Sequence, residues 1–264
     1  MISSYANYTA AVNSPYQGMY KTKSSITTVQ GRSYSLWTTA QDAGGTPTTA
    51  SGLSNLTTGS FGQLNSATAL WLPFQAMDLG NPGCIMVADR LAMQGGLSAT
   101  VTGLQNVNLP TAALPRYTSG SGVQAAVEIY TQIGTTGTTI KATGTFSDGT
   151  TGTSPVVTFG GTGYREASRF IILPLPAGKT GWQQITSVFI AASTTTAGNF
   201  GVTLFKPLSM LFDYSPGNQF VYDGIVGSGG NLPYIAQNAC LFYIVMSNAT
   251  SSGSLVARHV LIEG

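Results

Sequence analysis

Apolar and polar residues alternate along several short stretches of this sequence, most clearly in IKATGTFSDGTTGTSPVVTF, residues 140–159. From Ile140 to Phe146 every second residue is apolar or small, a period of two that indicates a half-buried strand. The pair Asp148-Gly149 predicts a two-residue hairpin turn, in a register that places Ile140 opposite Val157. Because Pro155 cannot donate a backbone hydrogen bond, the returning strand is expected at a sheet edge.

Similar strand signals recur along the chain from residue 70 onward, separated by turns rich in Gly, Pro and Asn. The run CLFYIVM, residues 240–246, is apolar throughout, which favours a strand covered on both faces. Ala88–Gln94 (ADRLAMQ) is the one stretch that we expect to form a short helix. The pattern predicts an all-β fold with a β-sandwich or jelly-roll-like body. The further expected strands are Leu70–Met77, Cys84–Arg90, Leu97–Leu109, Gly122–Ile133, Phe170–Leu175, Ile185–Ala192, Phe200–Phe205, Ala239–Met246 and Ser254–Ile262.

The first 69 residues differ from the rest of the chain. Residues 43–77 carry no charge, and much of this run is Gly, Thr and Ser with few large apolar side chains. Such a segment cannot bury much by itself, so we expect residues 1–69 to form an extended N-terminal arm with loops, and residues 70–264 to form the body. Short strands are expected near residues 26–29 and 34–37, with Tyr34 and Trp37 as anchors.

Charged residues make up only 8% of the 264 residues, whereas soluble domains have about 25%. A surface of Thr, Ser, Gly, Asn and Gln has little charge repulsion to keep copies apart, which suits a protein packed against neighbours. The formal net charge of +2 comes without a dense basic cluster, so nucleic acid is not an expected partner.

The sequence has neither a run of ~20 apolar residues nor the pattern of a secretion signal at its start. We therefore expect no membrane partner and assembly in a cytoplasm. Cys84 and Cys240 each lie in an apolar run, and two buried thiols are favoured over one disulfide.

Residues able to carry out chemistry are few and scattered. His259 is the only histidine, and its place in an alternating strand favours a packing role over catalysis. The nine carboxylates show no catalytic or metal-binding spacing; Asp89-Arg90 and the group Arg165, Glu166 and Arg169 are expected to be surface or subunit-contact ion pairs. The sequence therefore predicts a protein that is not an enzyme, with no catalytic, cofactor-binding or metal-binding residues.

Three segments resemble virion structural proteins of tailed bacteriophages in their general residue pattern and in the order of their strands. These segments are Asp89–Pro110, Leu114–Gly152 and Ala192–Ser209. The resemblance covers about residues 70–264. It implies a virion protein assembled in the bacterial cytoplasm, of the capsid decoration (cement) or minor capsid type, that stabilises the shell by bridging subunits. The implied partners are the major capsid protein and copies of the chain itself, in a homo-oligomer such as a trimer. The alternatives are a tail component (tube or baseplate) and a receptor-binding fibre or spike.

For a decoration role the arm supplies the expected contact residues, because aromatic side chains bury large areas and basic ones can meet an acidic shell surface. The alternative is that these tyrosines cover the protein's own sandwich. The expected subunit or capsid contacts are Tyr5, Tyr8, Tyr16, Tyr20, Lys21, Lys23, Arg32 and Trp37.

Overall fold

The computed structural model describes residues 16–39, 42–61, 70–215, 217, 220–223 and 233–263. Of Tyr16, Gln17, Pro73, Asp223 and Glu263 it describes the backbone alone. These ranges form strands and loops without a helix, and every strand pair is antiparallel. The all-β prediction with a sandwich-like body is therefore confirmed.

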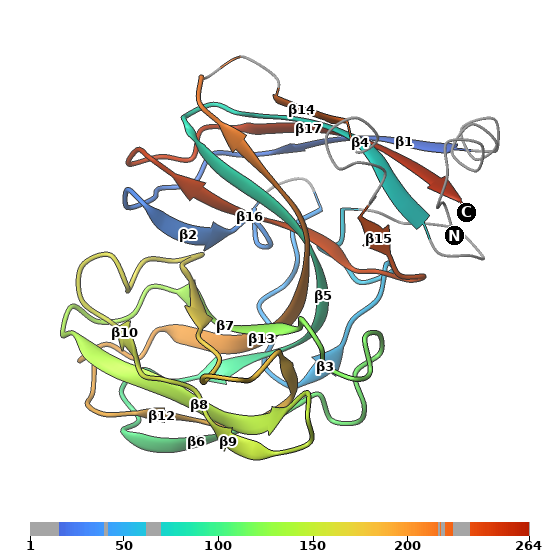
Figure 1. The fold of residues 1–264 in the computed structure, drawn as a ribbon. Helices are drawn as coiled ribbons and strands as arrows, with labels where there is room; N and C mark the ends of the chain where they lie inside the picture. The colour runs from blue at the N-terminus through green and yellow to red at the C-terminus, as the bar shows by residue number, and fades with distance from the viewer. Residues whose placement is uncertain are drawn as a thin grey trace.

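The strands form three sheets, stacked from top to bottom in Figure 1. The terminal sheet holds both ends of the described chain, and the distal sheet lies at the opposite end of the molecule. The terminal sheet consists of β1 (Tyr16–Lys23), β17 (Leu255–Glu263), β4 (Leu70–Leu79), β14 (Phe220–Asp223) and β15 (Tyr234–Ile235). The central sheet consists of β11 (Phe170–Leu173), β7 (Gln124–Thr131), β13 (Asn199–Asp213), β5 (Gly83–Leu97), β16 (Leu241–Ser247), β2 (Arg32–Ser35) and β3 (Ser51–Gly52). The distal sheet consists of β10 (Val157–Phe159), β8 (Thr138–Phe146), β12 (Trp182–Ile190), β6 (Gly103–Leu109) and β9 (Thr151–Thr153).

The central sheet belongs to two sandwiches at once. Its strands β5 and β13 are 15 residues long, and they run from the terminal-sheet end to the distal-sheet end. At one end Ile85 and Val87 pack in a core shared with the terminal sheet. At the other end Leu91 and Val202 pack in a core shared with the distal sheet. One pair of strands therefore spans both halves of the molecule (Figure 1).

The central sheet curls until its two edge strands, β2 and β11, come together. Tyr34 of β2 forms a β-bridge with Arg169, and the Ser35 amide donates to the Ser168 carbonyl at 2.8 Å. The buried Arg169 guanidinium crosses this seam and donates to the carbonyls of Ser33, Gly163 and Phe170. A side chain beside β11 thus satisfies a backbone acceptor of β2, the Ser33 carbonyl, which holds the curl closed.

Inside the curl lies a third core, built from aromatic rings around a buried ion pair. Phe170, Phe205 and Phe242 contact one another edge to face at 5.2–6.3 Å. Arg90 lies over the rings of Trp37 and Phe242, at 4.3 and 4.5 Å from their centres. These contacts cover the guanidinium with aromatic faces, an arrangement that suits a planar delocalised cation.

The Arg90 guanidinium pairs with the Glu128 carboxylate at 2.5 Å, and both side chains are fully buried. The same carboxylate oxygen accepts hydrogen bonds from Thr203 and Tyr130, at 2.8 and 3.1 Å. A second pair, Arg116 with Asp89, is bidentate at 2.7 and 2.8 Å, with Asp89 fully buried. The expectation that Asp89-Arg90 is a surface ion pair is wrong, because each residue pairs with a distant partner inside the protein.

The expected short helix at Ala88–Gln94 is also wrong, since these residues belong to β5. Their side chains pack on both faces of the central sheet, so the burial pattern lacks the one-sided stripe of a surface helix. CLFYIVM does form the buried interior strand β16, as predicted. Cys84 and Cys240 are buried free thiols, the favoured of the two alternatives.

The predicted hairpin is present, and its turn is one residue longer than expected. Ile140 pairs with Val157, as predicted, and the returning strands β9 and β10 lie at the sheet edge. At the turn Phe146 donates to the Thr150 carbonyl at 2.9 Å, which encloses three residues, and Gly149 adopts a φ of 79°. A three-residue loop ending in a left-handed glycine is the next most common hairpin after the two-residue type.

The described part of the expected arm contributes strands to the chain's own sheets. β1 pairs with β17, β2 with β16, and β3 with β5. Trp37 fixes the glycine-rich loop that follows, because a Cβ on Gly44 would lie 2.0 Å from its ring. The short strand expected near residues 34–37 is present as β2, and Tyr34 and Trp37 are buried anchors as predicted. The pairing of β1, β2 and β3 with distant strands could not be recognised from the sequence, since those partners lie more than 30 residues away.

We predict that Glu128→Gln lowers the free energy of unfolding by about 3 kcal/mol, because it keeps the shape and leaves the Arg90 charge buried without a counter-charge. Adding Arg90→Met should restore more than half of this loss, since the second substitution removes the stranded charge. Urea unfolding of the two single variants and the double variant measures the coupling.

The exposed pair Lys179–Asp148 provides the matched control for this measurement. Asp148→Asn should leave the urea midpoint unchanged, because solvent screens an exposed pair. Equal unfolding curves for Glu128→Gln and the wild type would contradict the assigned role of the buried pair.

Candidate assembly surface

The structure places the predicted contact residues in different environments. Tyr20 of β1 is 59% exposed, and the Arg258 guanidinium lies 5.7 Å from its ring centre. Lys21 pairs with Asp42 at 2.8 Å near the surface. Tyr5 and Tyr8 lie outside the described residues, as does the side chain of Tyr16. Tyr20 is thus the aromatic residue of this set that the structure places at the surface.

The other members of the set make contacts within the chain. Trp37 is fully buried beneath Arg90 in the core inside the curl. Lys23 is buried and donates to the Asp42 carbonyl at 3.2 Å; burial lowers its pKa to about 8, and Asp42 opposes that shift. Arg32 stacks on the ring of Tyr164 at 4.4 Å. In this conformation neither Trp37 nor Lys23 presents its side chain to a partner.

The chain places several of its few charges inside. Among the side chains that the structure describes, six charged ones are buried: Lys23, Asp89, Arg90, Glu128, Arg169 and Asp213. Since the composition holds only 20 charged residues, the outer surface is even poorer in charge than the sequence indicates. Apolar side chains on that surface therefore have few charged neighbours.

An exposed apolar cluster, which we call the aromatic corner, lies where β13 leaves the central sheet and β14 begins at the edge of the terminal sheet. The Tyr214 ring stacks on Phe212 at 6.3 Å and meets Phe220 edge to face at 5.8 Å. Met210 and Phe212 are each 47% exposed, and Tyr214 is 75% exposed. The aromatic corner consists of Met210, Phe212, Tyr214 and Phe220.

The aromatic corner is the part of the candidate site that sequence reasoning missed. We expected the strand to end at Phe205, but β13 continues to Asp213. The signal was the spacing of Met210, Phe212 and Tyr214, which occupy every second position and so share one side of an extended chain. Pairing of Phe212 with Cys84 and of Cys84 with Met246 places Met246, which is also exposed, on that same face.

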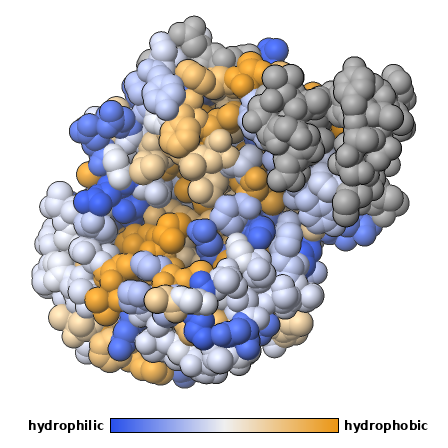
Figure 2. Space-filling view, viewed as in Figure 1, coloured by the Kyte–Doolittle hydropathy of each residue, from blue (hydrophilic) through white to orange (hydrophobic). Residues whose placement is uncertain are grey.

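A second apolar cluster, the distal row, crosses the outer face of the distal sheet. Leu104 of β6 pairs with Phe189 of β12, which pairs with Lys141 of β8. Leu104 and Phe189 are exposed, and the Lys141 ammonium lies 5.4 Å from the Phe189 ring centre. Because the distal and terminal sheets lie at opposite ends of the molecule, the two clusters are far apart (Figure 1). Figure 2 shows hydrophobic residues reaching the surface near both ends.

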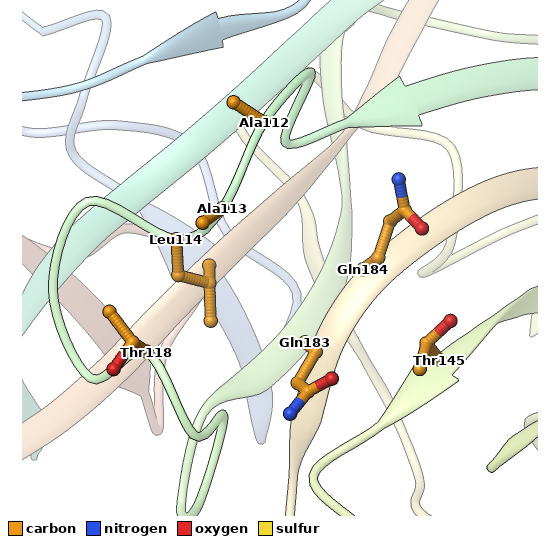
Figure 3. A pocket seen from close by; sticks show the side chains of 7 residues that line it. All are labelled: Ala112, Ala113, Leu114, Thr118, Thr145, Gln183 and Gln184. Carbon is orange, nitrogen blue, oxygen red and sulfur yellow. The ribbon is translucent and has the colours of Figure 1, made fainter. Parts of the chain in front are cut away.

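A polar hollow of about 220 Å³ lies between the loop after β6 and strands β8 and β12 (Figure 3). Thr118, Thr145, Gln183 and Gln184 supply its polar side chains, with Leu114 at its apolar wall. These side chains can donate and accept hydrogen bonds, but none of them titrates near neutral pH. The hollow therefore lacks a group suited to general acid–base catalysis.

His259 lies in the core between the terminal and central sheets. Its Nε2 is 2.8 Å from the Tyr243 hydroxyl, and its ring stacks on Phe61 at 5.3 Å. Its Nδ1 and the Nε2 of Gln75, the residue paired with it across the strands, have no hydrogen-bond partner among the described residues. Burial lowers the pKa of His259 to about 4, so the ring is neutral at pH 7.

Within the described ranges, no three His, Cys, Asp or Glu side chains lie close enough together to hold a metal ion. The same ranges contain no helix long and apolar enough to cross a membrane. The exposed apolar clusters are therefore the features of this surface that call for a functional explanation.

Comparison with solved structures yields weak matches to particles of infectious bursal disease virus. The Gt strain structure and the VP2 subviral particle match with TM-scores of 0.19, at 10% and 8% sequence identity, and the Gx strain with 0.17 at 11%. The matches cover 94–95% of this chain and 80–81% of those chains. No family model and no curated protein matches the chain. Superpositions this weak establish no shared fold, and the proposals below do not depend on them.

We predict that His259 makes the protein less stable in mild acid. Its pKa is about 4 when folded and about 6.5 when unfolded, so the unfolded state binds the proton first. The stability is complete above pH 6.5 and is lost as the pH falls toward 4, by about 2 kcal/mol between pH 8 and pH 5. Urea unfolding over this pH range measures the loss.

His259→Gln provides the control, because it removes the titrating ring and leaves the carboxylates in place. The variant should lose less stability than the wild type between pH 8 and pH 5, whatever its absolute stability. Parallel pH profiles for the two proteins would show that another group causes the acid sensitivity.

Proposed function

We propose that this chain is a non-enzymatic structural protein of a virion, and specifically a capsid decoration or minor capsid protein of a tailed bacteriophage. The observation that carries the proposal is the pair of exposed apolar clusters at opposite ends of one charge-poor body. Such a body can contact two neighbours at once. The resemblance of residues 70–264 to tailed-phage virion proteins supports the same assignment.

In the proposed mechanism the protein stabilises the shell by holding neighbouring subunits together through apolar contacts. Each cluster removes apolar surface from water when it meets a neighbour, worth about 25 cal/mol per Å² before the entropic cost of association. The central sheet links the clusters through β5 and β13, which run continuously between the two ends. A shell subunit held at one end is thereby coupled to a neighbour at the other end.

The proposed partners are the major capsid protein and copies of this chain. The distal row suits the shell, because it combines the exposed Leu104 and Phe189 with the Lys141 ammonium, which can meet an acidic surface. Tyr20 and Arg258 on the terminal sheet provide a similar pairing of an aromatic ring and a cation.

We predict that purified virions contain this chain in a simple numerical ratio to the major capsid protein, and that heads separated from tails retain it. Quantitative mass spectrometry of the two fractions gives the ratio. A few dozen copies or fewer, or recovery with tails, would favour a fibre or tail component. Absence from the particle would refute the structural role.

We predict that Leu104→Ser with Phe189→Ser reduces binding to heads stripped of this chain by at least tenfold, since both side chains are exposed. Leu56→Ser is the matched control, because Leu56 is 69% exposed against 61% for Leu104 and lies outside both clusters. Co-sedimentation with heads measures binding. Equal binding by the double variant and the control would exclude the distal row as the shell contact.

A further inference from the structure

We infer that a second copy of this chain covers the aromatic corner, so that two corners meet about a two-fold axis. The inference rests on the proposed function in treating the corner as an assembly surface. It adds the identity of the partner and the symmetry of the contact.

The exposed area of the corner is a substantial part of one side of a dimer interface. Aromatic side chains bury ~150–250 Å² each, so the exposed parts of Met210, Phe212 and Tyr214 together offer roughly 350 Å². A stable interface buries ~800 Å² per partner, of which the apolar centre is one part. The corner therefore supplies about half of the area that one side of a dimer needs, and the exposed Met246 extends the same face.

The surface of the corner is poor in free charge. Two described carboxylates near the corner are engaged by the chain's own backbone: Asp78 accepts from Gly217 at 3.2 Å, and Asp213 accepts from Leu79 and Ser215 at 2.6 and 3.1 Å. Asp213 is also buried. The corner thus presents rings and a thioether to a partner, and that partner must itself be uncharged where it makes contact.

On a neighbouring copy of the chain, a second aromatic corner suits this contact better than the distal row does. The distal row carries the Lys141 ammonium over Phe189, and a corner pressed against it would desolvate that charge with no free carboxylate opposite. A second corner has no such charge. Flat rings such as Phe212 and Tyr214, which already stack within 14° of parallel, also pack against similar rings at low entropic cost.

Two-fold pairing follows from self-recognition. A surface patch that binds its own copy forms an isologous contact, which closes after two copies. The corner therefore forms pairs, whereas the trimer expected from the sequence would need a contact between two different patches.

Sedimentation velocity of the full chain over ~0.1–100 µM tests the inference, a range that brackets common dimer affinities. The wild type should form a dimer, and Phe212→Ser with Tyr214→Ser should weaken it ~100-fold or more, because each substitution acts twice in a two-fold contact. Leu104→Ser in the distal row is the control and should dimerise as the wild type does. A monomeric wild type would overturn the inference, as would a dimer sensitive to Leu104→Ser and insensitive to the corner variant.

A charge-exchange pair tests the symmetry. Met210→Lys and Met210→Glu should each be monomeric, because like charges would face each other across the axis, and their mixture should form a heterodimer. A mixture that stays monomeric while the wild type dimerises would overturn the two-fold arrangement. Failure of dimerisation would leave the virion copy number unaffected, so it is distinguishable from failure of the proposed function.

Discussion

The curl of the central sheet is the constraint on which the rest of this structure depends. Strands β5 and β13 bend through three register shifts along their shared length, and the edges β2 and β11 meet at the Tyr34–Arg169 bridge. Arg169 satisfies the Ser33 carbonyl across that seam, and inside the curl Arg90 and Glu128 fix the spacing of β5 and β7. Breaking one partner of such a pair leaves a buried charge at a cost of several kcal/mol. The curl is therefore tied to one geometry.

This arrangement explains how a chain with so few charges is used. Several charged side chains, which would ordinarily lie on the surface, are buried here and stabilise the interior. The exterior consists of Thr-, Ser- and Gly-rich strands with scattered apolar side chains. An exterior of this kind loses little solvation energy when it is covered, since few charged groups must be stripped of water. The two sandwiches share one sheet, so covering either end leaves the spacing between the ends unchanged.

The assembly surface shifts accordingly from the arm to the body. The sequence directed attention to tyrosines and basic residues before residue 40, but Trp37 and Lys23 are internal and β1 is an integral strand. The exposed aromatic rings of the corner, Phe212 and Tyr214, come instead from the end of β13 and the residue that follows it, and Tyr214 meets the half-buried Phe220 of β14. Their exposure follows from geometry: β13 continues beyond the core inside the curl, so its side chains on that face lack a facing sheet, while Leu208 and Leu211 on the other face still pack against the terminal-sheet core.

The sequence by itself determined the all-β class, the positions of most strands, the buried strand β16 and the hairpin edge at Pro155, because period-two alternation and turn chemistry are local. It could not assign Ala88–Gln94, whose apolar run fits a helix or a doubly buried strand until its neighbours are known. Only the tertiary structure decided which residues form the buried ion pairs. Arg90 pairs with Glu128, 38 residues away, and Asp89 pairs with Arg116, 27 residues away. Contacts at such separations produce no periodic pattern in the sequence. The closed curl, the buried charges and the exposed corner can therefore be recognised only in the assembled sheets.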